Sequence, residues 1–418
     1  MNVSSRAAGS GPNRPMILIL LLAAVTINYI DRGSLSVAAP LVSTEFSLDK
    51  VHLGLLFSAF FWSYAIFQLV AGWLVDRYDV KWVYAGGFVL WSAATALTGF
   101  CSSFHILLLL RLLLGIGESV NYPAMSKIIA RHFPEEQRGF ANGLVDGGSK
   151  IGPALSTLIG GLLVSHYGWR ALFLTVGFFG FLWLLPWAAF FPSEPRHVTA
   201  ANRAEPGPTM LKILTRPEAW GTSMGMFALG YVWYFLLSWL PEYLVKERGF
   251  SMDAMAVLGS LPFWGMAFTS IAGGWISDRW ICSGATPTRV RKTFVVAGLF
   301  FCAAFMLPAG FVKSASLSLN FLILASLSLG IFTSNVWALT QTLAGPKAAG
   351  KWAAIQNAVG NVGGIVSPAL TGWIAQTTGS FVVAFVVASA VLLAGIACYL
   401  TLVGPVAPVD WEEPHRHA

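Results

Sequence analysis

Six charged residues lie inside segments that are otherwise apolar, and their chemistry would be anion binding and proton exchange. The six are Asp31, Arg32, Arg111, Glu118, Asp146 and Lys150. A charge at the centre of a bilayer costs at least about 2.5–3.5 kcal/mol, so such residues are rare and usually functional. All six belong to the first half of the chain, where we expect all of them to be buried. The second half has no comparable set, so recognition of a charged substrate is expected to be asymmetric.

Spacing limits how these charges can pair. Arg111 and Glu118 are seven residues apart and share a helix face, with Cα atoms about 10.5 Å apart along the axis. Asp31 and Arg32 diverge by about 100° around their helix, so they face different partners. We therefore expect pairs between helices, Asp31 with Arg111 or Arg32 with Glu118. A purely structural cluster that holds two helices together is the alternative.

The two signs of charge suit different tasks. Arginine is always charged and presents a planar fork that matches a carboxylate, which makes Arg32 the first candidate to hold an organic anion. Burial favours the neutral form of a carboxyl group, so Glu118 and Asp31 are the candidate proton carriers. Asp146 and Lys150 stand at i and i+4 and can pair on one face, either as a structural pair or as a contact to substrate.

Neutral polar residues in the same apolar segments could complete a site for a hydroxylated substrate. They are Tyr29, Tyr64, Gln68, Asn335, Asn357 and Asn361. Each lone amide or phenol in an apolar segment requires a partner. The hydroxyl groups of a carboxylated sugar would supply such partners, and hydrogen bonds between helices are the alternative.

Composition requires a membrane protein built of helices to position these residues. Of the 418 residues 56% are hydrophobic and only 11% are charged. Apolar runs long enough to span about 30 Å of hydrocarbon recur along the chain, and backbone polar groups in lipid must be satisfied within helices. Twelve spans are predicted, at residues 16–40, 52–75, 82–101, 104–130, 138–164, 169–191, 219–244, 254–276, 293–312, 316–340, 352–377 and 380–404.

The spans divide into two halves. Residues 1–191 and 219–404 each form a predicted six-helix bundle, joined by a linker at 192–218 and followed by a tail at 405–418. With the first residue inside the cell, inner loops and tails hold eighteen Lys and Arg against five in outer loops. This asymmetry predicts a multi-pass protein of the plasma membrane with both termini in the cytoplasm.

A motif repeats between the halves. The run from Gly72 to Asp76 and Arg77 returns 202 positions later as Gly274 to Asp278 and Arg279. Internal repetition is typical of transporters in which two bundles rock around a central site, so the six residues named here are expected to form gating loops. A solvated loop pair is the alternative for the first copy, which carries Asp79-Val80 after the motif.

The doubled Gly-x-x-x-Asp-Arg loop among twelve spans resembles the major facilitator superfamily. Within it, Asn28-Tyr29-Ile30-Asp31-Arg32 and Arg111 with Glu118 resemble the anion:cation symporter family, whose bacterial members take up sugar acids. Ser238-Trp-Leu-Pro241, Gly168-Trp-Arg170 and Gly360-Asn361 are similar too. The resemblance implies that Arg32 binds substrate, that Asp31 and Glu118 are protonated, that Arg111 modulates Asp31, and that Tyr64 and Asn361 contact substrate.

The sequence thus predicts a secondary active transporter that couples proton flow to uptake of a small organic anion, foremost a hexuronate, aldonate or aldarate. Alternatives are another carboxylate, sodium coupling, an organophosphate:phosphate antiporter or a membrane sensor. The antiporter would need cations from both halves, yet residues 219–244 contain neither Lys nor Arg. We expect a monomer, with no enzymatic constellation, metal, cofactor or nucleic-acid partner.

Overall fold

Helices make up all the regular structure in residues 13–192 and 208–411, which are the residues that the computed structural model describes. The first half contains α1 (Arg14–Glu45), α2 (Lys50–Arg77), α3 (Val80–Thr98), α4 (Phe104–Glu118), α5 (Asn121–His132), α6 (Glu135–Leu155), η1 (Ser156–Gly160), α7 (Gly161–Tyr167) and α8 (Trp169–Phe190). After the short α9 (Met210–Leu214), the second half contains α10 (Pro217–Glu242), η2 (Tyr243–Glu247), α11 (Met252–Cys282), α12 (Pro287–Phe311), α13 (Ala315–Thr378) and α14 (Val382–Thr401).

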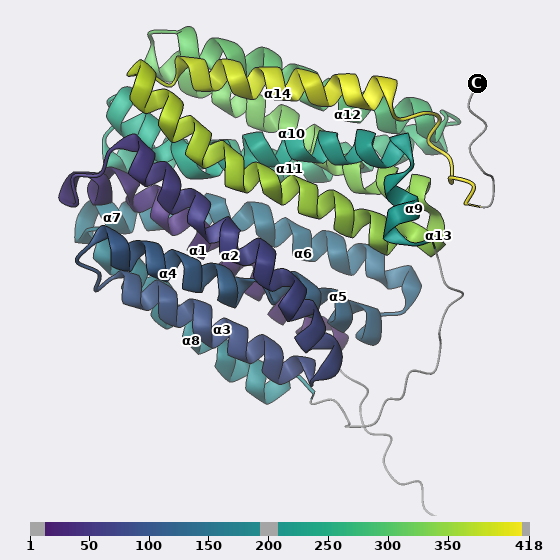
Figure 1. Cartoon of the computed structure of the whole chain (residues 1–418), viewed down its shortest axis with the longest axis horizontal. Helices are drawn as coiled ribbons and strands as arrows, with labels where there is room; N and C mark the ends of the chain where they lie inside the picture. Colours follow the sequence, from purple (N-terminus) through teal and green to yellow (C-terminus); the bar gives the residue numbers. More distant parts are fainter. Residues whose placement is uncertain (1–12, 193–207, 412–418) are drawn as a thin grey trace, which may run out of the picture.

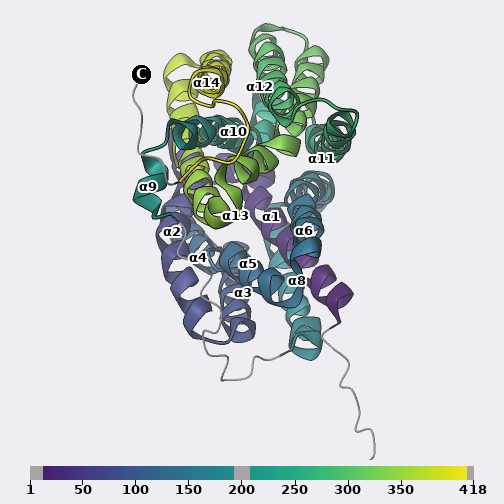
Figure 2. The same cartoon turned by 90° about the vertical axis from the view of Figure 1, so that its right-hand side faces the viewer.

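These helices form twelve rods. In the described part of the chain, ten are long and apolar enough to cross a membrane, with α4 and α5 as one rod and α13 as two. The more polar α6–η1–α7 rod and the 19-residue α3 run alongside them (Figure 1). Figure 2 shows the rods in two groups, the first half below and the second half above. The predicted all-helical membrane fold is confirmed.

Two breaks in the rods follow from residue type. Pro123 has no N–H, so it cannot bond the carbonyl of Ser119, and α4 ends at Glu118 before α5 begins at Asn121. In α13, Gly345 has φ 64° and ψ 176°, which is a left-handed conformation that glycine adopts readily. The rods on either side of Gly345 are therefore separate spans that meet in a tight turn.

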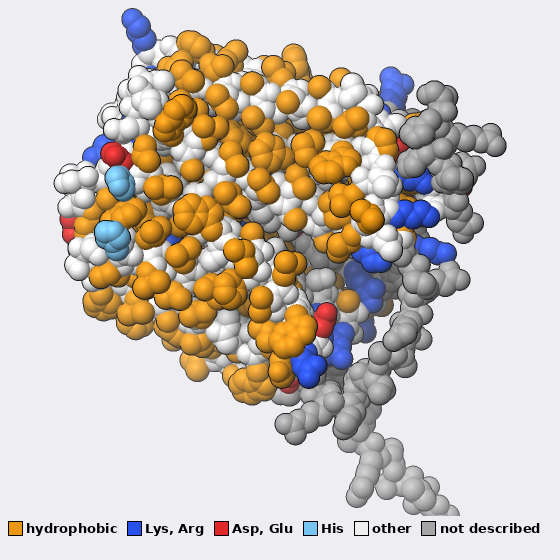
Figure 3. Space-filling view, in the orientation of Figure 1, with side chains coloured by type: hydrophobic (Ala, Val, Ile, Leu, Met, Phe, Trp, Pro, Cys, Tyr) orange, Lys and Arg blue, Asp and Glu red, His pale blue; other side chains and the backbone are white. Residues whose placement is uncertain are grey.

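The rods have two distinct ends. The end that carries α9, the start of α1 and the end of α14 is called the linker end, and the opposite end is called the far end (Figure 1). Lys and Arg side chains gather at the linker end in the space-filling view (Figure 3). Apolar side chains cover most of the face between the two ends, as a lipid-facing surface requires.

The two halves are in close contact toward the far end. A Cβ built on Gly54 of α2 would lie 2.7 Å from the carbonyl oxygen of Pro368, and one on Gly372 would lie 2.3 Å from that of Lys50. A Cβ on Gly161, at the start of α7, would lie 2.6 Å from Ala256 of α11. Side chains larger than hydrogen would push these helices apart, so the three glycines allow the far end to close.

Toward the linker end the halves separate. Positions Gly72 on α2 and Gly143 and Gly147 on α6 have no neighbouring atom within 4 Å of a built Cβ. Among the described residues, the hydrogen bonds between the halves lie on the far-end side of the protein. Their first-half members are Ser36 and Thr44 of α1, which come after Arg32, and Lys50 and Ser58 in the far-end part of α2. The space between the halves is thus closed at the far end and open toward the linker end.

Candidate functional site

A buried ion pair joins α1 to α4 at the middle of the first half. Arg32 Nε donates to Glu118 Oε2 over 2.7 Å, and the two side chains are 2% and 0% exposed. Of the pairs expected from the sequence, this one is present. Among the described residues, Arg32 Nη2 and Glu118 Oε1 have no hydrogen-bond partner. Each member of the pair therefore retains a free polar atom for another group.

Aromatic rings enclose the guanidinium. The Arg32 Cζ atom lies 4.8 Å from the ring centroids of Tyr29 and Phe60 and 4.7 Å from that of Tyr64. The Tyr29 hydroxyl lies 3.1 Å from the hydroxyl of Tyr122. Cation–π contacts of this kind hold a guanidinium in place without neutralising it. The sequence pointed to Tyr29 and Tyr64 but not to Phe60 or Tyr122. Phe60 lies in a helix with no periodic pattern that marks an inner face.

A single glycine brings α4 against α2 beside these rings. Gly115 lies between Arg111 and Glu118 on one face, and a Cβ there would be 2.4 Å from the carbonyl oxygen of Phe60. The approach places Arg111 over Phe60, with Cζ 5.3 Å from the ring centroid, and its Nε donates to the Leu56 carbonyl over 3.4 Å. Arg111 is thus held against α2, while Glu118 on the same face pairs with Arg32 of α1.

Asp31 is the fourth buried charge of this cluster. Its side chain lies within electrostatic reach of Glu118 and Arg111, but no ion pair within 4 Å joins it to Arg111 among the described residues. Its Oδ1 atom has no hydrogen bond of good geometry there, although the Thr95 hydroxyl is close enough to interact with the carboxyl group, and Asn28 is likewise close to Glu118. A buried carboxylate oxygen without a donor is costly, whereas a protonated carboxyl can donate to an amide or hydroxyl oxygen.

The second half contributes neutral polar groups. Tyr234 of α10 donates to Asn361 Oδ1 of α13 over 3.1 Å, and its ring centroid lies 4.4 Å from that of Phe61. Asn357 is half-buried one helical turn from Asn361, and Gln68 is half-buried one turn from Tyr64, both on the linker side. Tyr234 carried no signal in the sequence that separated it from other aromatic residues.

One expectation about burial was wrong, and one buried acid was missed. Lys150 pairs with Asp146 over 2.5 Å as predicted, but the Asp146 side chain is 45% exposed because α6 borders the open space between the halves. Glu242 of α10 is only 5% exposed, so the second half does contain a buried carboxylate. Its place after Pro241, near a predicted span end, hid it in the sequence.

The repeated loops differ in their contacts. In the second half, Arg291 Nη2 donates to Asp278 Oδ1 over 2.9 Å, and Arg291 Nη1 donates to Asn335 Oδ1 over 2.7 Å. Asn335 therefore belongs to this loop network and not to the aromatic cluster. Arg279 instead lies over the ring of Trp275, with Cζ 4.3 Å from its centroid.

The first loop is held by other groups. Asp79 caps α3 by accepting from the Lys81 amide over 2.9 Å, and the Lys127 ammonium donates to the carbonyl of Val75. Arg77 lies over Trp73, with Cζ 5.8 Å from the ring centroid. Asp79 takes this capping role at the place where the sequence departs from the family pattern.

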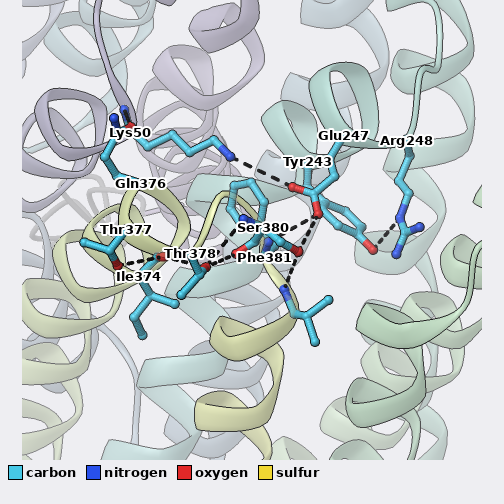
Figure 4. Close-up of polar contacts among 11 residues, drawn as sticks. Lys50, Tyr243, Glu247, Arg248, Ile374, Gln376, Thr377, Thr378, Ser380 and Phe381 are labelled. Atoms are coloured by element: carbon cyan, nitrogen blue, oxygen red, sulfur yellow. Dashed lines mark hydrogen bonds and ion pairs between the residues drawn. The ribbon is translucent and has the colours of Figure 1, made fainter.

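A polar cluster closes the far end between the halves (Figure 4). The Lys50 amide donates to Gln376 Oε1 over 3.2 Å, while its ammonium lies 4.0 Å from Glu247 Oε2. Glu247 also accepts from the amide of Phe381 over 3.2 Å, so α2, η2 and the start of α14 meet at one carboxylate. These partly exposed contacts are individually weak.

Two bundles that close on each other at one end, around buried charges, define a membrane protein of the alternating-access transporter type. The profile of the Major Facilitator Superfamily matches residues 21–368. The chain is 31% identical to the hexuronate transporter of Bacillus subtilis (strain 168) over 414 residues, covering 96% of this chain and 98% of that one. It belongs to the major facilitator superfamily and is thus a transporter-family protein, not an enzyme.

A second relative agrees with this, and a solved structure shows the same fold. A probable galactarate/D-glucarate transporter of Bacillus subtilis (strain 168) is 31% identical over 425 residues, covering 95% of this chain and 93% of that one. A bacterial homologue of the human lysosomal transporter Spinster, solved in an inward-facing and unoccupied conformation, superposes with a TM-score of 0.79 at 21% identity, covering 94% and 97% of the two chains. The predicted family is confirmed.

Proposed function

We propose that this protein is a proton-coupled symporter that takes up a small organic anion, foremost a sugar acid, across the inner membrane of a bacterium. The observation that carries the proposal is the Arg32–Glu118 pair, 2.7 Å long and enclosed by aromatic rings. The names of the relatives, which include a hexuronate and a galactarate/D-glucarate transporter, support the class of substrate.

The geometry suggests how protons and substrate compete. A deprotonated Glu118 occupies Arg32 Nε, so the guanidinium is already neutralised. Protonation of Glu118 removes that negative charge and leaves a buried cation, which costs free energy unless another anion pairs with it. A substrate carboxylate is that anion, and its entry at Arg32 is therefore coupled to a proton on Glu118.

Asp31 supplies the second exchangeable proton in this scheme. It shares the electrostatic surroundings of Glu118 and Arg111, and its Oδ1 lacks a hydrogen bond of good geometry among the described residues. Arg111 opposes protonation of both acids, because a nearby cation favours the charged carboxylate. Tyr64 and Asn361 would hold the hydroxyl groups of the substrate, and Tyr29, Gln68 and Asn357 would line its path.

Orientation follows from charge. We place the linker end in the cytoplasm, because the loops and tails assigned to it hold eighteen Lys and Arg against five at the other end. The structure then represents a state that is open to the cytoplasm, with Glu118 paired to Arg32 after release of substrate. The doubled loops at Asp76–Arg77 and Asp278–Arg279 would stabilise the opposite state, in which the linker end closes.

The test is uptake of radiolabelled glucuronate, galactonate and galactarate into liposomes that contain the purified protein, with and without an inward proton gradient. At least one acid is expected to accumulate only when the gradient is present. Uptake that ignores the gradient but follows a sodium gradient would overturn proton coupling, and absence of uptake of every acid would overturn the substrate class.

A further inference from the structure

We infer that Lys150 is a second anion-binding group, so that the preferred substrate carries two carboxylates at opposite ends, as an aldarate does. This rests on the proposed function and specifies its substrate. The Lys150 side chain is 10% exposed, and its ammonium pairs with Asp146 over 2.5 Å. The proposed mechanism uses Arg32, Glu118 and Asp31, and it assigns no role to the ion pair of Lys150 with Asp146.

The face of α6 that carries Lys150 looks toward the space between the halves. Gly148 and Gly152 pack against α1, where built Cβ atoms would lie 3.1 Å from the Leu22 carbonyl oxygen and 2.5 Å from Tyr29 Cβ. Lys150 is about 160° around the helix from each of these glycines, so it points away from α1. Thr157, two turns beyond Lys150 on the same face, lies against Gly259 of α11.

Lys150 therefore stands where closed contact between the halves gives way to open space. On its far side, α6 and η1 lead to the contact of Gly161 with Ala256. On its linker side, Gly147 and Gly143 have nothing within 4 Å of a built Cβ, and Asp146 is 45% exposed. A solute that enters from the linker end passes this ion pair before it reaches Arg32.

The depth of Lys150 fits one end of a short dicarboxylate. The packing of Gly148 and Gly152 sets Lys150 level with the Thr26 region of α1, about six residues or ~9 Å before Arg32. The connection between them is polar. Asp146 is within electrostatic reach of Tyr122, whose hydroxyl lies 3.1 Å from that of Tyr29, and the Tyr29 ring contacts Arg32. Hydroxyl groups along a sugar-acid chain would meet these phenols.

Charge balance favours a dianion as well. The three cations Arg32, Arg111 and Lys150 match the three acids Asp31, Glu118 and Asp146 in number. A substrate with two carboxylates adds two negative charges, and protons on Asp31 and Glu118 add two positive charges, so the net charge of the site stays at zero. This matters because a low-dielectric site penalises any net charge. Asp146 can give up Lys150 at small cost, because its half-exposed carboxylate stays in contact with water.

Galactonate and galactarate make the test, because they share a six-carbon hydroxylated chain and differ by one carboxylate. Binding of each to the detergent-purified, full-length protein is measured by competition and by thermal shift for wild type, Lys150→Gln, Lys150→Arg and Lys313→Gln. Lys313 is an exposed lysine in a far-end loop, so its variant controls for loss of one positive charge.

Lys150→Gln is expected to weaken galactarate binding roughly tenfold or more, the scale of one lost charge-assisted contact, and galactonate binding by less than about threefold. Lys150→Arg should restore most of the galactarate affinity, and Lys313→Gln should change neither. Equal loss of both affinities in Lys150→Gln, or no loss, overturns the inference while leaving sugar-acid transport intact. If wild type binds neither acid, the proposed function fails with it.

A variant at Asp146 decides the matter if Lys150→Gln does not fold. Asp146→Asn removes the carboxylate that competes with substrate for the ammonium. The ratio of galactarate to galactonate affinity is expected to rise by about threefold or more in this variant, because the free energy at stake is again that of one charge-assisted contact. An unchanged or lower ratio contradicts the role given to Lys150.

Discussion

Replacement of Arg32 by lysine is the sharpest test of how the site holds an anion. Lysine keeps the positive charge, but its ammonium is a point charge that lacks the planar fork and stacks less well on rings. In the structure one guanidinium nitrogen, Nε, serves Glu118, while Nη2 is unpartnered and free for substrate. A single ammonium, on a side chain with a shorter overall reach, cannot serve both positions with the same geometry.

The expected loss is that of one charge-assisted hydrogen bond, about 1.5–3 kcal/mol. This corresponds to a dissociation constant that is raised roughly 10- to 150-fold. Lost contact with the rings of Tyr29, Phe60 and Tyr64 adds to the effect. Binding of the best sugar acid is measured by equilibrium competition on purified protein, with melting temperature as the check on folding.

Arg170 provides a matched control. It forms a two-point pair with Glu45, with contacts of 2.8 and 2.7 Å, and lies over Trp169, but its side chain is 43% exposed. Exposed pairs contribute about 0–1 kcal/mol, so Arg170→Lys should leave affinity within about threefold of wild type. Wild-type affinity in Arg32→Lys, or an equal loss in Arg170→Lys, would refute the assignment of Arg32 as the anion-binding residue.

Three other changes test the architecture. Gly54→Val, whose first side-chain carbon would lie 2.7 Å from the Pro368 carbonyl oxygen, should open the far end. His166 Nδ1 of α7 and Asp253 Oδ1 of α11 lie 3.9 Å apart at this end, so spin labels at these two positions should report a longer distance than in wild type. An unchanged distance contradicts the closure described. Gly115→Val should lower the free energy of unfolding by about 1–3 kcal/mol, because the new side chain overpacks against Phe60. The measurement is the melting temperature, which should fall in Gly115→Val and stay unchanged in Gly143→Ala, since position 143 faces open space. Asp49 caps α2 by accepting from the His52 amide over 2.8 Å, and this bond holds the pKa of Asp49 below its ordinary value. Asp49→Ala should therefore cost about 0.5–2 kcal/mol at neutral pH, and melting curves of the two proteins should converge below about pH 4, as the wild-type carboxylate is protonated; a difference that persists in acid argues against the cap.

Much of this fold follows from the sequence because the bilayer leaves a chain few choices. Long apolar runs must be helices, and every predicted span overlaps a rod of the structure. The pair of Arg32 with Glu118 was foreseeable too, because two buried charges of opposite sign must find partners on neighbouring helices.

The surroundings of that pair were not foreseeable. Phe60 and Tyr234 lie in helices that are apolar on all sides, so no periodic pattern shows which face turns toward the site. Asn335 resembles a substrate ligand in sequence but binds Arg291, because only the packing of α11, α12 and α13 brings those residues together. The exposure of Asp146 likewise depends on which end of the two halves is open.

Proton-driven uptake by wild type and by Glu118→Gln tests the central claim most directly. The variant keeps the shape of the side chain but carries no exchangeable proton, so it mimics the protonated acid beside Arg32. We predict that wild type accumulates the sugar acid against its gradient when the outside is acidic. Glu118→Gln should lose that accumulation while still exchanging labelled for unlabelled substrate. Accumulation by Glu118→Gln at the wild-type level would contradict the account.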